Sequence, residues 1–226
     1  PMSPLLRLFK SSLGKKYLMA ITGLGLFGFV VMHMLGNLQV FLGPEAINKY
    51  AAFLQSTPEL LWPARIGLLA MVGVHFCAGI LLVIENMQAR EQQYEVKRVV
   101  KATLASRTMV VSGLVVLSFI IYHLAHYTLL VIHPEYRNLH DELGRHDVYR
   151  MIVIGFSNPY VAGFYVVGVG LLCFHLSHGI GAMFQSLGLK NEAYVERIDC
   201  AAKVIAVGLF IGYISIPLAV QIGMVK

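Results

Sequence analysis

The chain has 226 residues, of which 57% are hydrophobic and only 13% are charged, and its formal net charge is +6. This composition excludes an ordinary soluble globular protein, in which about 25% of residues are charged. The positive mean hydropathy indicates an integral membrane protein instead. No nucleic-acid partner is expected, because the basic residues are spread over the loops between apolar runs.

Five apolar runs are long enough to cross a bilayer, since about 20 apolar residues in a helix span its ~30 Å hydrocarbon core. We expect these spans at residues 17–42, 63–86, 107–132, 159–185 and 203–225. Asn158 followed by Pro159 is typical of a helix start, so the stretch before it, 147–156, is expected to form a short interfacial helix. The predicted fold class is an all-α integral membrane protein with one domain, 1–226, in which a four-helix bundle is joined by a fifth helix.

Lysine and arginine in the loops predict the orientation, because these residues gather on the cytoplasmic side. The N-terminus and the loops after the second and fourth spans carry 12 of them, and the opposite side carries 6. We therefore expect the N-terminus in the cytoplasm and the C-terminus outside.

Four histidines, each in a different charge-free segment, are the main functional candidates: His33, His75, His123 and His175. A metal-ligating or ionisable side chain at bilayer depth is costly, so each position is a candidate functional site. Counting ~1.5 Å per residue along the spans places the first and third histidines toward the outside and the other two nearer the inside. The matching depths predict two stacked pairs, which is what two six-coordinate haem irons require.

The helix faces beside these histidines carry small residues, which would let a flat porphyrin approach. Thr22 lies 11 residues before His33, and Ser112 lies 11 residues before His123. Small residues also mediate ordinary helix packing in lipid, so this pattern leaves both interpretations open.

Two further histidines lie three residues after a candidate ligand and are open alternatives: His126 and His178. The cysteines, Cys77, Cys173 and Cys200, do not have the spacing of an iron–sulfur site. There is also no GxGxxG motif and no phosphate loop, so flavin, nicotinamide and nucleotide binding are not expected in this chain.

The segments around the four histidines are similar to those of a known family. FVVMHMLGN, GVHFCAGI, FIIYHLAH and GFYVVGVGLLCFHLSHG resemble the single-chain, five-helix, dihaem cytochrome b subunit of succinate dehydrogenases and fumarate reductases. The resemblance covers nearly the whole chain. It implies that the four histidines are the axial ligands of two b haems, paired as their depths predict. It favours His126 and His178 as groups behind the ligands or beside the haem propionates over a role as ligands.

By this resemblance, the chain is the membrane anchor of a succinate:quinone oxidoreductase, the respiratory complex II of the tricarboxylic acid cycle, in a prokaryotic cytoplasmic membrane. A flavoprotein subunit would carry out the dicarboxylate chemistry, and an iron–sulfur subunit would pass electrons to the inner haem. The long polar segment 85–107 is a candidate docking surface for these partners or a merely solvated extension. Whether the complex forms a higher oligomer is left open by the sequence.

Quinone chemistry needs a protonatable or hydrogen-bonding group beside a haem. Glu59 in STPELLWPAR resembles an acidic residue at which some fumarate reductases of this family oxidise menaquinol; the alternative is a solvated loop carboxylate. Asn37 and Gln39 are candidates to bond a quinone carbonyl, and Trp62 is a candidate flat wall. The expected substrate is menaquinone or another quinone.

Haem propionates need cationic or hydrogen-bonding partners near the ends of the bundle. On the outer side the candidates are Arg65 and Arg150, and Arg150 resembles a family arginine that precedes the fourth span. Cys173 stands where certain fumarate reductases carry a glutamate of a transmembrane proton path. The resemblance therefore argues against that path in this chain.

Two other functions stay open at this point. A dihaem cytochrome b anchor of a hydrogenase or formate dehydrogenase would differ in its soluble partners. A histidine-lined transporter or proton channel without haem would lack the absorption bands of haem b.

Overall fold

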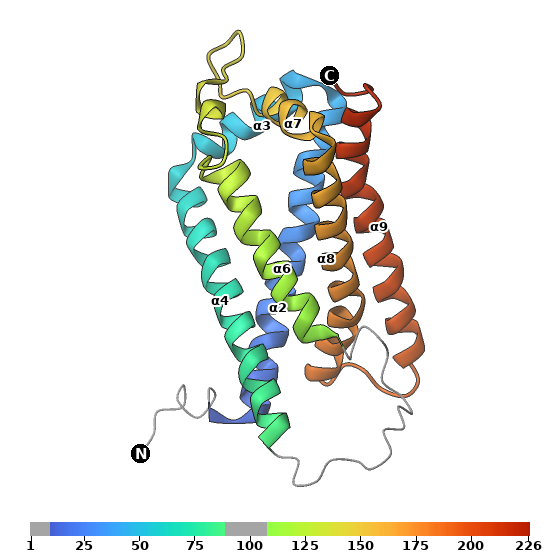
Figure 1. Ribbon diagram of the computed structural model, residues 1–226. Helices are drawn as coiled ribbons and strands as arrows, with labels where there is room; N and C mark the ends of the chain where they lie inside the picture. Colours follow the sequence, from blue (N-terminus) through green and yellow to red (C-terminus); the bar gives the residue numbers. More distant parts are fainter. Residues whose placement is uncertain (1–9, 89–107) are drawn as a thin grey trace.

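The computed structural model describes residues 10–88 and 108–226, which form an upright bundle of helices (Figure 1). Five helical segments in this part of the chain are long and apolar enough to cross a membrane, which confirms the predicted all-α, five-span fold class. They are α2 (Ser12–Asn37) with its 3-10 extension η1 (Leu38–Leu42), α4 (Pro58–Gln88), α6 (Met109–His123) with its π-helical end η2 (Leu124–Thr128), α8 (Pro159–Ser186) and α9 (Val195–Gln221).

Four of the spans are grouped here in chain order. Helix α2 packs along α4 and α6 packs along α8, and we call these the first and the second helix pair; α2 contacts α8 about as extensively as α6 does. The two pairs meet mainly where α2 contacts α8, whereas α4 and α6 touch each other only sparsely. Helix α9 lies against α8 at the edge of the bundle (Figure 1).

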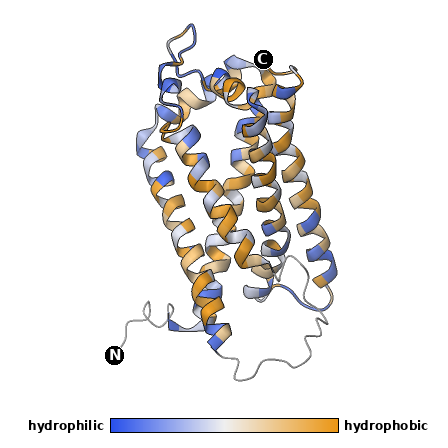
Figure 2. Cartoon of the chain, viewed as in Figure 1, coloured by the Kyte–Doolittle hydropathy of each residue, from blue (hydrophilic) through white to orange (hydrophobic). Residues whose placement is uncertain are grey.

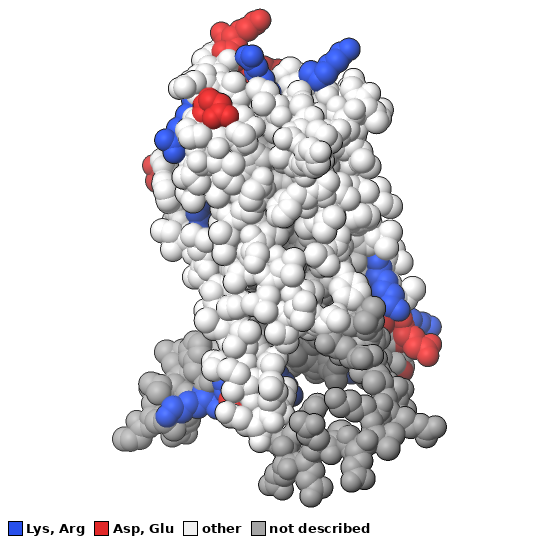
Figure 3. All heavy atoms as spheres, viewed as in Figure 1, with Lys and Arg blue, Asp and Glu red and all other residues white. Residues whose placement is uncertain are grey.

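The surface is that of a protein surrounded by lipid. Apolar residues dominate the middle of the bundle (Figure 2), and the charged side chains gather toward its two ends (Figure 3). Large apolar side chains such as Met32, Ile66 and Val167 are each 62% exposed on the spans. Such exposure in water would be unfavourable, but lipid is as apolar as these side chains. The chain is therefore a multi-pass membrane protein.

The first span begins earlier than the charge-free run suggests. The Ser11 hydroxyl accepts a hydrogen bond from the Gly14 N–H (3.0 Å) and caps α2 at its N-terminus. One turn later, Lys15 is only 4% exposed, because its Nζ pairs with the Glu85 carboxylate of α4 at 2.5 Å. A paired charge can lie inside a span. Because the expected helix start was set at the first charge-free residue, it came too late in the sequence.

Two short helices lie across the upper end of the bundle as drawn in Figure 1: α3 (Pro44–Gln55) and α7 (Val148–Ser157). The sequence analysis anticipates α7 but not α3. Gly43 precedes α3 with a φ of 94°, a conformation that favours glycine, and Pro44 suits the first helical turn. Between the two helices, the buried Asn48 donates to Asp147 Oδ1 (3.0 Å) and accepts from the Tyr149 N–H (3.0 Å).

An ion-pair network fastens the loop before α7 to α3. Arg145 lies 2.6 Å from the Glu45 carboxylate and 2.7 Å from Asp141 Oδ2. The hydrogen bond from Arg145 lowers the pKa of Glu45, and the two carboxylates together raise the pKa of Arg145. For Asp141, burial raises the pKa, but the hydrogen bonds from Arg145 and from the Leu143 N–H outweigh it, so the pKa is lowered.

Candidate functional site

The first candidate site lies toward the upper end of the bundle. His33 of α2 and His123, the last residue of α6, have ring centroids 5.7 Å apart and ring planes at 81°. Each ring is covered by a phenylalanine of its own helix: Phe29 stacks on His33 (5.2 Å) and Phe119 on His123 (6.2 Å). We call His33 and His123 the upper pair.

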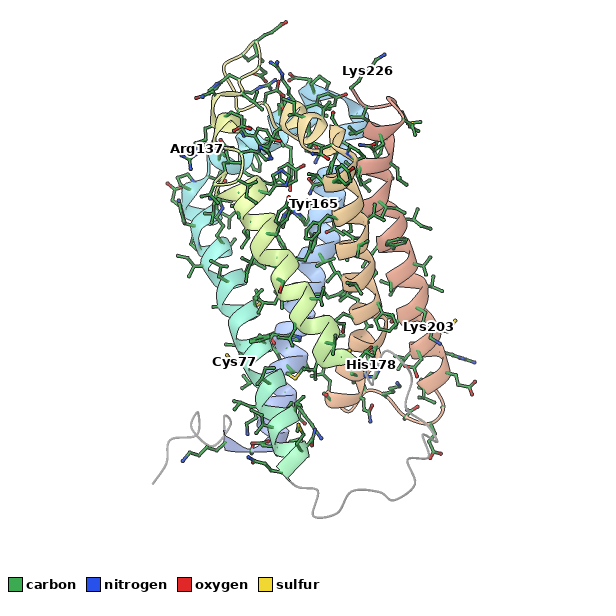
Figure 4. The ribbon with its side chains drawn as sticks, viewed as in Figure 1. Cys77, Arg137, Tyr165, His178, Lys203 and Lys226 are labelled. Atoms are coloured by element: carbon green, nitrogen blue, oxygen red, sulfur yellow. The ribbon has the colours of Figure 1, made fainter. Side chains whose placement is uncertain are left out.

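The second candidate site lies lower in the bundle. His75 of α4 and His175 of α8 have ring centroids 6.5 Å apart and ring planes at 69°; we call them the lower pair. Figure 4 labels Tyr165, which contacts His123, near the upper end and Cys77, two residues after His75, in the lower part. Each pair takes one histidine from each helix pair, and the depth count predicts the same two combinations.

The donor set limits what these pairs could hold. Among the residues that the structure describes, no group of three or more histidine, cysteine, aspartate or glutamate side chains could hold a bare metal ion. Two imidazoles match the two axial positions of an iron whose remaining ligands come from a macrocycle. With metal–nitrogen bonds of ~2.0–2.1 Å, two axial imidazoles need centroids roughly 6 to 6.5 Å apart. The lower pair, at 6.5 Å, lies within this range, and the upper pair, at 5.7 Å, is slightly closer. The residues present fit two bis-histidine haems.

The lower pair has polar support that the sequence analysis did not foresee. His75 Nδ1 lies 3.1 Å from the Thr22 hydroxyl of α2, and His175 Nδ1 lies 3.1 Å from the Ser112 hydroxyl of α6. From the sequence alone, Thr22 and Ser112 are expected only as small residues on a helix face. Both residues stand 11 positions before an upper histidine, and this shared spacing is the sequence feature that could have indicated their role.

Shallow apolar grooves flank the lower pair. One, of about 150 Å³, is lined by Lys15 and by residues of α4 on either side of His75, including Val74 and Ala78. The other, of about 240 Å³, is lined by Ser112 of α6 and by Phe174 of α8, among others. Apolar walls beside a pair of imidazoles are suited to a flat hydrophobic ligand.

His126 lies next to the upper pair, in an aromatic cluster whose Tyr127 and Tyr165 also contact His123. It is fully buried, its Nδ1 is 3.0 Å from the Tyr165 hydroxyl, and its ring stacks on Tyr127 at 4.0 Å. Its Nε2 and the Tyr127 hydroxyl have no hydrogen-bond partner within the described ranges. The π-helical turn η2 carries both residues, and Leu130 just beyond it has a φ of 52°. Such irregular backbone is frequent at functional sites.

His178 lies on α8, one turn beyond His175. Its surroundings include the ion pair between Lys190 and Asp199, whose Nζ and Oδ1 are 2.6 Å apart. Figure 4 shows His178 near the lower end of the bundle. The ring contact with His75 is made by His175, not by His178.

The candidate quinone residues lie on two elements near the upper end. Asn37 donates to the His33 carbonyl (2.7 Å), so part of its hydrogen-bonding capacity closes the last turn of α2. Gln39 follows, half-buried, in η1. Glu59 and Trp62 are exposed in the first turns of α4. Their roles toward a quinone stay predictions.

The two arginines expected beside haem propionates are both exposed. The Arg65 guanidinium lies 5.4 Å from the centre of the Trp62 ring, so these two candidates contact each other. Arg150 is in the first turn of α7, where its N–H donates to Asp147 (3.0 Å). Most of the expected docking segment, 89–107, lies outside the described residues.

Residues 1–102 of the 226 match the family model of the succinate dehydrogenase/fumarate reductase transmembrane subunit. The comparisons with curated proteins and with solved structures returned no match. The matched region contains the whole first helix pair, and with it His33 and His75. The match covers less than half of the chain, so it is the N-terminal part of the chain that is similar to the succinate dehydrogenase/fumarate reductase transmembrane subunit family.

Proposed function

We propose that the chain is the cytochrome b anchor of a succinate:quinone oxidoreductase and carries electrons through two b haems between an iron–sulfur subunit and a membrane quinone. The observation that carries the proposal is the stacking of two histidine pairs at different depths, each pair bridging the two helix pairs. The family match supports the complex to which the chain would belong.

The four histidines would hold the two haems as axial ligands, the upper pair one and the lower pair the other. When bound, the haems would supply one-electron redox chemistry at two depths of the membrane. Around the upper pair, Phe29 and Phe119 keep water from the imidazole rings. Around the lower pair, the apolar walls of α4, α6 and α8 do the same.

A quinone would react near the upper pair, on the outer side, with menaquinone as the proposed substrate. Glu59 would exchange protons with it, while Gln39 and the free capacity of Asn37 would bond its carbonyl. Trp62 would provide the flat wall, and Arg65 and Arg150 would pair with haem propionates. In this orientation the N-terminus faces the cytoplasm, where a flavoprotein and the iron–sulfur subunit would dock.

The test is a reduced-minus-oxidised visible spectrum of the purified complex, combined with a haem-to-protein ratio. We expect two b haems per chain. His33→Ala and His123→Ala should each remove the upper haem, whereas His75→Ala and His175→Ala should each remove the lower one. His140→Ala, in an exposed loop, is the matched control and should retain both.

Three results would contradict the proposal. A wild-type complex with a single haem, or with none, would exclude the paired arrangement. Loss of a haem in His126→Ala but not in His123→Ala would reassign the ligand on α6. Copurification with hydrogenase or formate dehydrogenase subunits, identified by mass spectrometry, would keep the haems but replace the proposed enzyme.

A further inference from the structure

We infer that the Thr22 and Ser112 hydroxyls are positioning groups for the lower haem, which accept the Nδ1–H of His75 and His175 and aim each Nε2 at the iron. The inference rests on the proposed function, because it assigns a role to residues that contact two proposed ligands. Neither hydroxyl is itself placed against the metal.

The direction of the bond to His75 follows from counting hydrogens. A threonine hydroxyl has one hydrogen to donate, and the Thr22 hydroxyl donates it to the Leu18 carbonyl at 2.6 Å. The 3.1 Å contact with His75 can then be a hydrogen bond only if His75 Nδ1–H is the donor. That tautomer leaves the Nε2 lone pair free to bind a metal.

The second helix pair repeats the arrangement. The Ser112 hydroxyl lies 3.1 Å from the Met109 carbonyl and 3.1 Å from His175 Nδ1. With its hydrogen on the carbonyl, as inferred for Thr22, it accepts the Nδ1–H of His175. Thr22 is 8% exposed and Ser112 is 4% exposed, so water does not compete for either bond. Both lower imidazoles are thereby fixed in the same tautomer by a buried hydroxyl of the neighbouring helix.

A glycine follows each hydroxyl, and the imidazole lies close to it, more tightly at Gly23 than at Gly113. A Cβ on Gly23 would lie 3.2 Å from His75 Cε1, and a Cβ on Gly113 would lie 3.5 Å from His175 Cε1. The hydroxyl–glycine dipeptide stands 11 residues before the upper ligand on both α2 and α6. These two helices are therefore built alike: each contributes one ligand to the upper pair and one support to the lower pair.

The chemical effect of the hydroxyls is predictable in sign. A hydrogen bond from Nδ1–H makes an imidazole ligand more basic and holds its ring plane, and loss of such a partner costs about 10–100-fold in metal affinity. A more basic ligand favours ferric iron. Removing the hydroxyls should therefore raise the midpoint potential of the lower haem and weaken its retention.

The experiment compares Thr22→Val and Ser112→Ala with Thr22→Ser and Ser112→Thr in the purified complex. The readouts are the midpoint potential, the low-temperature electron paramagnetic resonance signal and the retention of the lower haem, with the upper haem as internal reference. Ser112→Ala should weaken retention about tenfold. Thr22→Val should act in the same direction on the His75 side of the site.

The conservative variants should restore wild-type values. Ser118→Ala is the matched control, because Ser118 lies on α6 and bonds the Leu114 carbonyl (3.0 Å) without a contact to the lower pair. Unchanged lower-haem properties in both Ser112→Ala and Thr22→Val would overturn the inference, as would an equal shift in Ser118→Ala. A wild-type complex without two haems would overturn the proposed function instead.

Discussion

The two histidine pairs are supported in different ways although the same four helices build both. The lower imidazoles have their Nδ1 atoms on aliphatic hydroxyls, Thr22 and Ser112, at 3.1 Å. The upper imidazoles are packed between aromatic rings, and the nearest hydroxyl to His123 Nδ1 is that of Tyr165, at 3.4 Å. The imidazole rings of the lower pair are thus oriented by hydrogen bonds, and those of the upper pair by packing.

This difference predicts different sensitivities. A site oriented by packing should respond to changes in volume, because protein interiors tolerate little overpacking. A site oriented by hydrogen bonds should respond to loss of a single polar atom. Substitutions near each pair can therefore show whether the two supports are independent.

The largest effect is expected from Gly168→Ala on α8. A Cβ there would overlap the Phe119 ring, which is 8% exposed and stacks on His123. Such overpacking costs about 1–3 kcal/mol. The upper haem should be lost at a lower temperature while the lower haem is retained, as followed by visible absorbance during heating. Gly163→Ala, with open space at its Cβ, is the control, and equal behaviour of the two variants would contradict the packing argument.

Tyr165→Phe is expected to act next most strongly. It removes the hydroxyl 3.0 Å from His126 Nδ1 and leaves both nitrogens of that buried ring without a partner. An unsatisfied buried polar group costs about 1–3 kcal/mol, part of which a relaxed ring can recover. Stability of the upper haem should fall, with the lower haem unchanged, and Tyr160→Phe, 87% exposed, should have no effect. A change of stability confined to the lower haem would contradict this and show that the two sites are coupled.

A smaller effect is expected from Gly23→Ala. Its Cβ would press on His75 at 3.2 Å, whereas the Cβ of Gly113→Ala would make an ordinary contact with His175 at 3.5 Å. Gly23→Ala should therefore alter the paramagnetic resonance signal of the lower haem more than Gly113→Ala does. The reverse order would mean that the glycines do not set the imidazole positions.

The smallest effect is expected from Glu45→Gln, which lies near neither pair. The hydrogen bond from Arg145 lowers the pKa of Glu45, so this ion pair stabilises the folded protein at neutral pH and is lost as the pH falls through the folded pKa, below the ordinary value of 4.5. Wild type should be slightly more stable than the variant at pH 7, and the difference should vanish in acid. Thermal unfolding at both pH values measures this, and a difference that grows in acid would have the wrong sign.

The spans and the histidine combinations could be predicted from the sequence because the bilayer reduces the problem to one dimension. A residue's number along a span gives its depth, so His33 and His123 could be matched without knowledge of side-chain contacts. The contacts of Thr22 and Ser112 depend on which face α2 presents to α4 and which face α6 presents to α8. That rotation about the helix axis is set by packing, which hydropathy does not encode.

Helix α3 and the π-helical turn η2 could not be predicted from the sequence for a different reason. Helix α3 is amphipathic and short, and its position depends on Asn48 reaching Asp147, 99 residues away in sequence. The π-helical turn that carries His126 depends on a backbone register that no local residue pattern specifies.

The exchange of partners between the helix pairs bears on how the protein is assembled. Each histidine pair draws one member from α2 or α4 and the other from α6 or α8, so half of the molecule contains no complete site. Loading of the proposed haems would then follow the meeting of the two helix pairs in the membrane. Once in place, each proposed haem would join a helix of the first pair to a helix of the second, α2 to α6 or α4 to α8, so failed insertion would loosen the tertiary structure as well as stop electron flow.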